Sequence, residues 1–290
     1  MRIRILGSAA GGGVPQWNCA CAGCSAARAS GTHRTQDSVA VTGDGTAWYL
    51  LNASPDIRAQ LLAAEPLRPG PGPRDTPIRG VLLTTAEIDH TAGLLSLREA
   101  GALTLYATGT VLGALRTALP IVPVLRRYTE LRVHALPIGE PVPLEGGLTV
   151  RAAAIGAKVP RYADQCAADE RAGDDWVCAL RVSDDRTGRA FVYATCLPEW
   201  SDTFDEFLDG ADAALLDGTF ATEDEPARQA GLSRTPRQMG HLPITGAIPA
   251  LRRHGRTRVL FGHLNNTNPF AGTGAETPVE IAQDGQELDC

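Results

Sequence analysis

Short apolar runs and amphipathic stretches alternate along most of the chain. Runs of about four to eight aliphatic or alternating residues are typical of strands, whereas apolar residues that recur roughly every three or four positions are typical of helices. This pattern predicts strands at 2–7, 38–42, 46–51, 81–84, 104–107, 131–136, 148–155, 176–182, 190–194, 213–216 and 258–261. It predicts helices at 54–64, 111–118, 199–208 and 244–254, and a further helix that begins at Gly93. Ser54 is the predicted N-cap of the first.

The alternation of strands and helices occurs twice, before and after about residue 150. This repetition predicts an α/β (α+β) fold in which two sheets lie inside and helices cover them outside. We expect one domain over 1–290, built from two α/β halves. The segment 156–175 shows no clear period, and we interpret it as a flap. We assign no role to the polar tail at 277–290.

Composition and charge narrow the class of protein. With 43% apolar and 21% charged residues the chain has an ordinary globular composition. Its net charge of -6 argues against a nucleic-acid-binding surface, which needs a basic field. No apolar run is long enough to span a bilayer, and residues 1–7 lack the apolar core of a secretion signal. We infer a cytoplasmic protein, and leave its oligomeric state, including a homo-oligomer, open.

Polar side chains gather where the apolar strand at 81–84 ends. Glu87, Asp89 and His90 follow this strand directly. In open α/β folds ligands bind at the carboxyl ends of strands, and Asp and neutral His are donors that suit a divalent transition metal. The stretch therefore predicts part of a metal site. The alternative is an ordinary helix start, with Asp89 near the N-cap and an incidental histidine.

Other predicted strands also end at polar residues, among them Cys196 and His263. Asp89, His90 and His263 would together bind one metal and leave coordination positions open, which is the pattern of a catalytic metal.

Asp217 ends a predicted strand, and His241 follows a glycine in a later loop. A carboxylate beside an imidazole orients it and raises its basicity, so this pair predicts a general acid/base. The alternative is that Asp217 caps a loop and His241 is solvated. The dense polar turn at 262–269 is either a structural turn or a wall of the site.

The seven cysteines, an odd number without an export signal, argue against a disulfide framework. Cys19, Cys21 and Cys24 are spaced to hold one ion, and a fourth donor would complete a structural zinc site. His33 is the nearest fourth donor in sequence, and Asn266 is the candidate after His263. The alternative is three free buried cysteines.

Five blocks of the chain closely resemble the B-protein family of pyrroloquinoline quinone (PQQ) biosynthesis. They are 7–19 (GSAAGGGVPQWNC), 52–58 (NASPDIR), 88–99 (IDHTAGLLSLRE), 239–242 (MGHL) and 263–269 (HLNNTNP). That family belongs to the metallo-β-lactamase superfamily, so the resemblance implies an αββα sandwich.

The resemblance also implies a reduced metal site. The superfamily motif is His-x-His-x-Asp-His, and the corresponding residues are Thr85, Glu87, Asp89 and His90. The histidine expected after 155 is missing, and the bridging aspartate falls near 195–196. A two-metal hydrolase needs both ions, which argues against that activity. The set that remains is Asp89, His90 and His263.

The family resemblance implies iron-dependent, oxygen-using hydroxylation of the tyrosine ring of a peptide-derived Glu-Tyr precursor. The expected cofactors are Fe2+ at the active site and a structural Zn2+. Asp217 and His241 would handle the phenolic proton, and Glu87 would support the metal or bind it weakly. The resemblance further suggests substrate-binding residues in the matching blocks: Asn52, Ser54, Asp56, Asn265 and Asn268.

Two other functions stay open from the sequence. A carrier for PQQ or its precursor, acting in transport towards the periplasm, would keep the same pocket, and a single zinc ion could support hydrolysis. Other proteins of the PQQ pathway are candidate partners.

Overall fold

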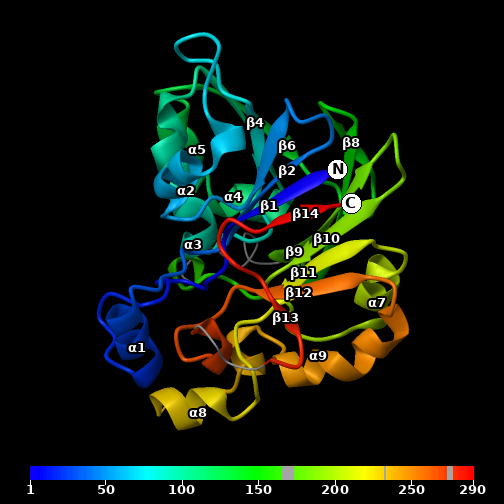
Figure 1. Ribbon diagram of the computed structural model, residues 1–290. Helices are drawn as coiled ribbons and strands as arrows, with labels where there is room; N and C mark the ends of the chain where they lie inside the picture. Colours follow the sequence, from blue (N-terminus) through cyan, green and yellow to red (C-terminus); the bar gives the residue numbers. More distant parts are fainter. Residues whose placement is uncertain (165–172, 232, 273–276) are drawn as a thin grey trace.

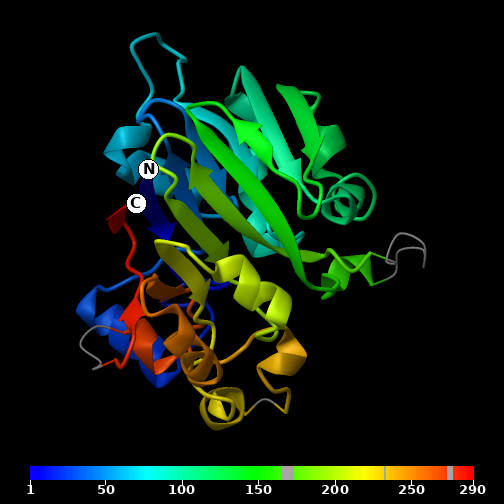
Figure 2. The same cartoon turned by 90° about the vertical axis from the view of Figure 1, so that its right-hand side faces the viewer.

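Two β-sheets form the centre of the structure, and helices cover their outer faces (Figures 1 and 2). The computed structural model describes residues 1–164, 173–231, 233–272 and 277–290. In these residues the first sheet has the order β14-β1-β2-β3-β4-β5-β6 and the second the order β13-β12-β11-β10-β9-β8-β7.

The first sheet contains β1 (Arg2–Gly7), β2 (Ser38–Thr42), β3 (Trp48–Leu51), β4 (Ile78–Leu82), β5 (Ala102–Ala107), β6 (Glu130–Ala135) and β14 (Glu287–Asp289). The second contains β7 (Val142–Leu144), β8 (Leu148–Gly156), β9 (Val177–Asp184), β10 (Ala190–Ala194), β11 (Ala213–Asp217), β12 (Arg258–Gly262) and β13 (Glu280–Ile281). The chain thus passes from one sheet to the other between β6 and β7, near the predicted midpoint.

The α-helices are α1 (Ala22–Ser30), α2 (Ile57–Ala63), α3 (Ile88–Thr91), α4 (Gly109–Ala114), α5 (Ile121–Leu125), α7 (Asp202–Leu208), α8 (Glu225–Ala230) and α9 (Ile244–Leu251). Short 3-10 helices are η1 (Glu65–Leu67), η2 (Ala92–Glu99), η3 (Arg161–Ala163), η4 (Arg237–Met239), η5 (Arg252–His254) and η6 (Pro269–Ala271).

Three apolar layers hold the sandwich together. Alternate residues of the strands, such as Ile3, Ile5 and Phe191, are fully buried between the sheets. Another cluster joins the first sheet to α2, α4 and α5, and a third joins the second sheet to α7 and α9. Each sheet therefore buries both faces, which the order helix, sheet, sheet, helix requires.

The strands predicted from the sequence are present, with ends shifted by a few residues, but several other predictions were wrong. The helix after β4 begins at Ile88 rather than Gly93, so Asp89 and His90 lie in its first turn. Ser54 is not an N-cap, because α2 begins at Ile57 and the Ser54 hydroxyl donates to Gln60 instead. The sequence analysis also missed β7 and α5.

The polar tail at 277–290, to which we assigned no role from its sequence, contributes a strand to each sheet. It forms β13, which pairs with β12, and β14, which pairs antiparallel with β1. Figure 1 shows the two ends of the chain side by side for this reason. Part of the predicted flap, 165–172, lies outside the described residues. Among those described, no helix is long and apolar enough to cross a membrane.

Candidate metal centre

Polar residues converge where parallel strands of both sheets end. Strands β3 to β6 run parallel, as do β10 to β13. His90, Cys196 and His263 follow the ends of β4, β10 and β12, and Asp217 is the last residue of β11. A cavity of about 1010 Å³ opens here, and its lining includes Asp89, Cys196 and His263. The polar residues that the sequence places after separate strands thus lie together at the carboxyl ends of these strands, where ligands bind in open α/β folds.

Two threonine hydroxyls orient the two buried histidines. Thr85 Oγ1 lies 2.8 Å from His90 Nδ1, and Thr219 Oγ1 lies 2.8 Å from His263 Nδ1. The imidazole rings lie edge to face with centroids 5.2 Å apart. Because Nδ1 of each ring is engaged, Nε2 is the nitrogen left for a metal, and such outer contacts fix a ligand's tautomer and direction.

The environment of His90 Nε2 is the observation that most directly indicates a bound ion. This nitrogen is fully buried and forms no hydrogen bond with any of the described residues. A buried polar atom without a partner costs about 1–3 kcal/mol, so this environment fits an ion at Nε2. Nε2 of His263 lies 3.3 Å from Asp89 Oδ2, which brings the third predicted ligand to the second histidine.

Electrostatics around the histidines favour a cation. Burial lowers the pKa of His90 to about 4, which keeps its imidazole in the neutral form that binds metals. Burial opposes the charge on Asp89, but the attraction of His90 and the contact with His263 outweigh it and lower the pKa of Asp89. Burial also opposes the charge on His263, but its contact with Asp89 outweighs burial and raises the pKa of His263.

His263 also has an unusual backbone. Its φ of 55° lies in the left-handed region, which residues other than glycine rarely adopt. Such strain costs on the order of 1–3 kcal/mol and is retained where the surrounding structure fixes it, commonly at functional sites.

Asp217 and His241 form the predicted carboxylate–imidazole pair. Asp217 Oδ2 lies 2.8 Å from His241 Nδ1, and it also accepts from the Leu197 amide. A carboxylate only accepts, so the proton lies on His241 Nδ1 and leaves Nε2 as a base. His241 is buried and lines the cavity, while its ring stacks on His263 with centroids 5.5 Å apart. Asp217 therefore holds a loop and orients an imidazole at once.

Asp37 is a candidate functional residue that the sequence analysis missed. Its buried carboxylate lies 3.7 Å from His90 Nε2 and accepts from Tyr193 and Thr195, whereas Oδ1 has no partner among the described residues. Burial raises its pKa to about 6. Local sequence gives no signal for this role, because Asp37 precedes β2 and its partners lie on and after β10.

Glu87 lies on the cavity wall rather than at the histidines. Its Oε1 forms a 3.1 Å ion pair with Lys158 Nζ. Lys158, Arg161 and Arg234 also line the cavity, so its wall carries three cations.

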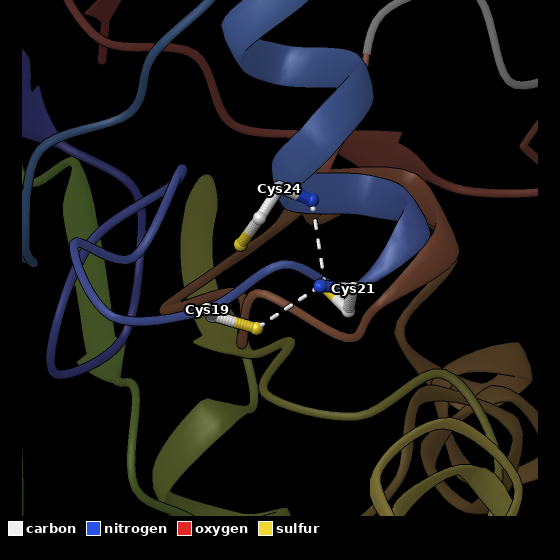
Figure 3. Close-up of side chains that lie close together, drawn as sticks. All are labelled: Cys19, Cys21 and Cys24. Atoms are coloured by element: carbon white, nitrogen blue, oxygen red, sulfur yellow. Dashed lines mark hydrogen bonds between the residues drawn. The ribbon is translucent and has the colours of Figure 1, made fainter.

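Cys19, Cys21 and Cys24 come together at the start of α1, as Figure 3 shows. Their sulfur atoms lie within 4.8 Å of one another. The side-chain amide of Asn266 reaches all three, with its nitrogen 3.1 Å from Cys19 Sγ. His33, the other predicted fourth ligand, is exposed and contacts the Gly31 carbonyl instead.

Of the predicted substrate-binding residues, Asn265 lines the cavity. The other four belong to loop-stabilising contacts and are not among the lining residues. Asn52 donates to Thr84 and Tyr193, Ser54 to Gln60 and Asn268 to the Gly218 carbonyl, while Asp56 accepts from Gln36. Their side-chain polar groups are thus engaged in contacts within the fold.

Comparison with known proteins defines the class. A model of the β-lactamase superfamily domain matches residues 47–264. The structure of Zn(2+)-bound PqqB from Methylobacterium extorquens is 34% identical, covers 100% of both chains and has a TM-score of 0.87. A diphosphatase of the PhnP family, 20% identical over 99% of this chain and 97% of its own, has a TM-score of 0.72 and shares the fold. The chain is a metallo-β-lactamase-fold protein.

Curated relatives define the family within this class. Coenzyme PQQ synthesis protein B of Cupriavidus necator is 44% identical over 99% of this chain and 96% of its own length. The protein of the same name from Methylococcus capsulatus is 38% identical over 99% of each. The chain therefore belongs to the coenzyme PQQ synthesis protein B family.

Proposed function

We propose that this protein acts in PQQ biosynthesis as an iron-dependent oxygenase that hydroxylates the tyrosine ring of a peptide-derived Glu-Tyr precursor. The family supports the pathway. The observation that carries the metal-dependent part is the buried Nε2 of His90, which has no hydrogen-bond partner among the described residues and whose ring lies beside His263 on the cavity lining.

Asp89, His90 and His263 are the residues that would hold the iron. Two imidazoles and one carboxylate are a ligand set typical of non-haem iron oxygenases, in which open positions remain for oxygen and substrate. When bound, iron would supply the activation of dioxygen. The protein supplies the two threonine contacts that aim the imidazoles and the buried surroundings that keep His90 neutral.

The pair Asp217–His241 would take the proton of the phenol. The protonated Nδ1 of His241 faces Asp217, so the basic Nε2 is the atom available to accept the phenolic proton. The cavity, at about 1010 Å³, is large enough for a dipeptide. Lys158, Arg161 and Arg234 on its lining would pair with the carboxylates of the glutamate side and the C-terminus.

The direct test is anaerobic loading of the purified protein with ferrous iron, followed by Glu-Tyr, oxygen and a two-electron reductant. One oxygen atom of O2 enters the ring and the other leaves as water, so each hydroxylation adds one oxygen to the substrate mass. We expect this gain in the wild type and its loss in Asp89→Asn and His263→Ala. His134→Ala, which changes an exposed histidine on β6, is the matched control and should keep the activity.

Two outcomes would contradict the proposal. Unchanged substrate mass together with tight binding of PQQ or a precursor would instead support a carrier. Release of free glutamate and tyrosine by the zinc-loaded protein would support a single-zinc hydrolase.

A further inference from the structure

A hollow in the helical layer over the first sheet is lined mainly by arginines. Its volume is about 460 Å³, and its lining includes Arg74, Arg98, Arg126, Arg127 and Tyr128. These residues come from three segments, namely the loop before β4, η2 and the chain that follows α5. Figure 1 shows α5 on the outer side of the first sheet. Among the described residues, none lines both this hollow and the metal cavity, so the hollow is a separate feature of the surface.

The positive charge of this hollow is only partly neutralised. Arg126 and Arg127 are exposed, and their side chains form no ion pair or hydrogen bond within the described part of the chain. Two other arginines of the lining share one carboxylate, that of Glu99, at 3.6 and 3.7 Å. The carboxylate of Glu130 is engaged by Arg132 at 2.7 Å. The hollow therefore has guanidinium groups left over for carboxylates from outside.

The charge of the whole chain makes this surplus distinctive. Residues 1–141 contain 13 arginines and lysines against 10 acidic residues, whereas residues 142–290 contain 14 against 23. The hollow thus lies in the basic half of a chain whose net charge is -6. Complementary charge steers partners to such a surface and fixes their orientation. The expected ligand is acidic.

Exposed apolar side chains beside the arginines point to a polypeptide rather than a free anion. Tyr128 is 65% exposed, Val124 on α5 is 43% exposed and Leu95 on η2 is 40% exposed, and α5 and η2 contact each other. Tyrosine and arginine are the side chains that anchor protein interfaces most often. Thr129, also in the lining, has a buried Oγ1 without a hydrogen-bond partner among the described residues. A phosphate ion would use the arginines but not the apolar groups.

We propose that this hollow binds an acidic segment of a partner protein, whose carboxylates pair with Arg126 and Arg127 and whose apolar side chains pack on Tyr128. Arginine suits this role because its planar guanidinium can bind a carboxylate through two parallel hydrogen bonds. A symmetric dimer through the same face would bring the arginines of both copies together, which disfavours a second copy as the occupant. The inference does not rest on the proposed oxygenase activity.

The test uses two fluorescently labelled synthetic peptides of about 16 residues. Both have leucine at every third or fourth position, and the remaining positions are mostly glutamate in one and lysine in the other. In fluorescence anisotropy at low salt, we expect the glutamate peptide to bind about tenfold more tightly than the lysine peptide, or better. Its binding should weaken in about 0.5 M NaCl, because salt screens exposed charges.

Charge reversal locates the binding surface. The double variant Arg126→Glu with Arg127→Glu should lower affinity for the glutamate peptide about tenfold or more. The control, Arg252→Glu with Arg256→Glu, makes the same change at two exposed arginines of the other half and should bind like the wild type. Tyr128→Ala should weaken binding at both salt concentrations, because it removes apolar contact rather than charge. Melting temperatures verify that each variant is folded.

Three results would overturn the proposal. They are equal binding of the two peptides, no binding of the glutamate peptide, and equal losses in the two double variants. Self-association of the wild type in analytical ultracentrifugation that the reversal of Arg126 and Arg127 abolishes would also overturn it, and would make the hollow a contact between copies. None of these measurements involves hydroxylation, so this proposal and the proposed function can fail independently.

Discussion

Two threonine hydroxyl groups orient the rings of the two buried histidines in this site. Thr85 and Thr219 each engage Nδ1 of a buried histidine, which leaves Nε2 for a metal. Thr219 Oγ1 also lies 3.0 Å from His241 Nδ1, so one side chain contacts both a proposed metal ligand, His263, and the proposed base.

Thr219→Val should therefore weaken metal binding without removing a ligand. The substitution removes the hydroxyl and leaves the buried Nδ1 of His263 without its partner. We expect metal affinity to fall by about 10- to 100-fold, the usual effect of losing such an orienting contact. Thr219→Ser, which keeps the hydroxyl, should bind metal like the wild type. Equal affinities for the valine and serine variants, measured by competition with a chelator, would contradict this role.

His241→Gln should separate proton transfer from metal binding. If His241 is the base, metal content stays unchanged while kcat falls by about 10²- to 10⁴-fold. Asp217→Asn should behave similarly, because the asparagine cannot hold the imidazole in the same proton state. Loss of the active-site metal from His241→Gln would show instead that the imidazole is a ligand.

Local sequence was sufficient to single out Asp89, His90, Asp217, His241 and His263 as candidates, because each follows a strand end or lies in a family motif, and the structure brings these side chains together. It could not identify Asp37 or Thr219, whose contacts come from segments distant in sequence. Nor could it separate Asn265, on the cavity, from Asn268, which caps η6. Whether a polar side chain in a turn faces a ligand or the backbone is decided by tertiary packing.

At the scale of elements, the three-cysteine group is joined to the loop that carries His263. Asn266 lies against all three sulfur atoms, and α1 packs on this loop through Ala27 and Leu264. Metal at the cysteines would therefore stabilise the loop that carries His263 and Asn266 as well as α1.

Cys24→Ser should remove one zinc ion per chain and lower the melting temperature. A metal present at a hundred times its Kd stabilises the folded state by about 3 kcal/mol. The variant that no longer binds this zinc should lose about that much free energy of unfolding. Cys178→Ser is the control, because it makes the same substitution at a cysteine outside the group, and this variant should keep the zinc ion. An unchanged zinc content in Cys24→Ser, measured by elemental analysis, would show that the group does not bind zinc.

Asp205 joins α7 to η5, since its carboxylate accepts from His254, Arg253 and the Trp200 ring. Burial opposes its charge, but these donors outweigh burial and lower the pKa of Asp205. Because the folded pKa lies below the unfolded value of about 3.9, the stabilisation is present above that pH and is lost as the pH falls further. Asp205→Asn should cost about 2 kcal/mol at pH 7.

The pH dependence distinguishes this ion pairing from a packing effect. In urea unfolding, the difference between wild type and Asp205→Asn should shrink as the pH falls below about 4. A difference that stays constant from pH 7 to pH 3 would contradict the assignment.

At the scale of the whole molecule, the periodic pattern was sufficient to predict two sheets covered by helices, and the superfamily model and the solved structures confirm this fold. The pattern failed for β13 and β14, which are short and partly polar. Arg2 pairs with Asp289 across nearly the full chain, so these strands form because partners from distant segments are already aligned. The sequence pattern within either segment contains no trace of that pairing.

The two sheets together create a site that neither could form alone. His90 follows a strand of the first sheet, whereas Cys196 and His263 follow strands of the second. The cavity and the proposed metal ligands therefore depend on how the sheets face each other.

The most direct test of this account is a crystal structure of the iron-loaded protein with anomalous scattering recorded at the iron and zinc edges. The account predicts an iron peak within bonding distance of Nε2 of His90 and His263, and a separate zinc peak among Cys19, Cys21 and Cys24. An iron-loaded crystal with no peak between the two histidines, or with iron bound only at the cysteines, would contradict it.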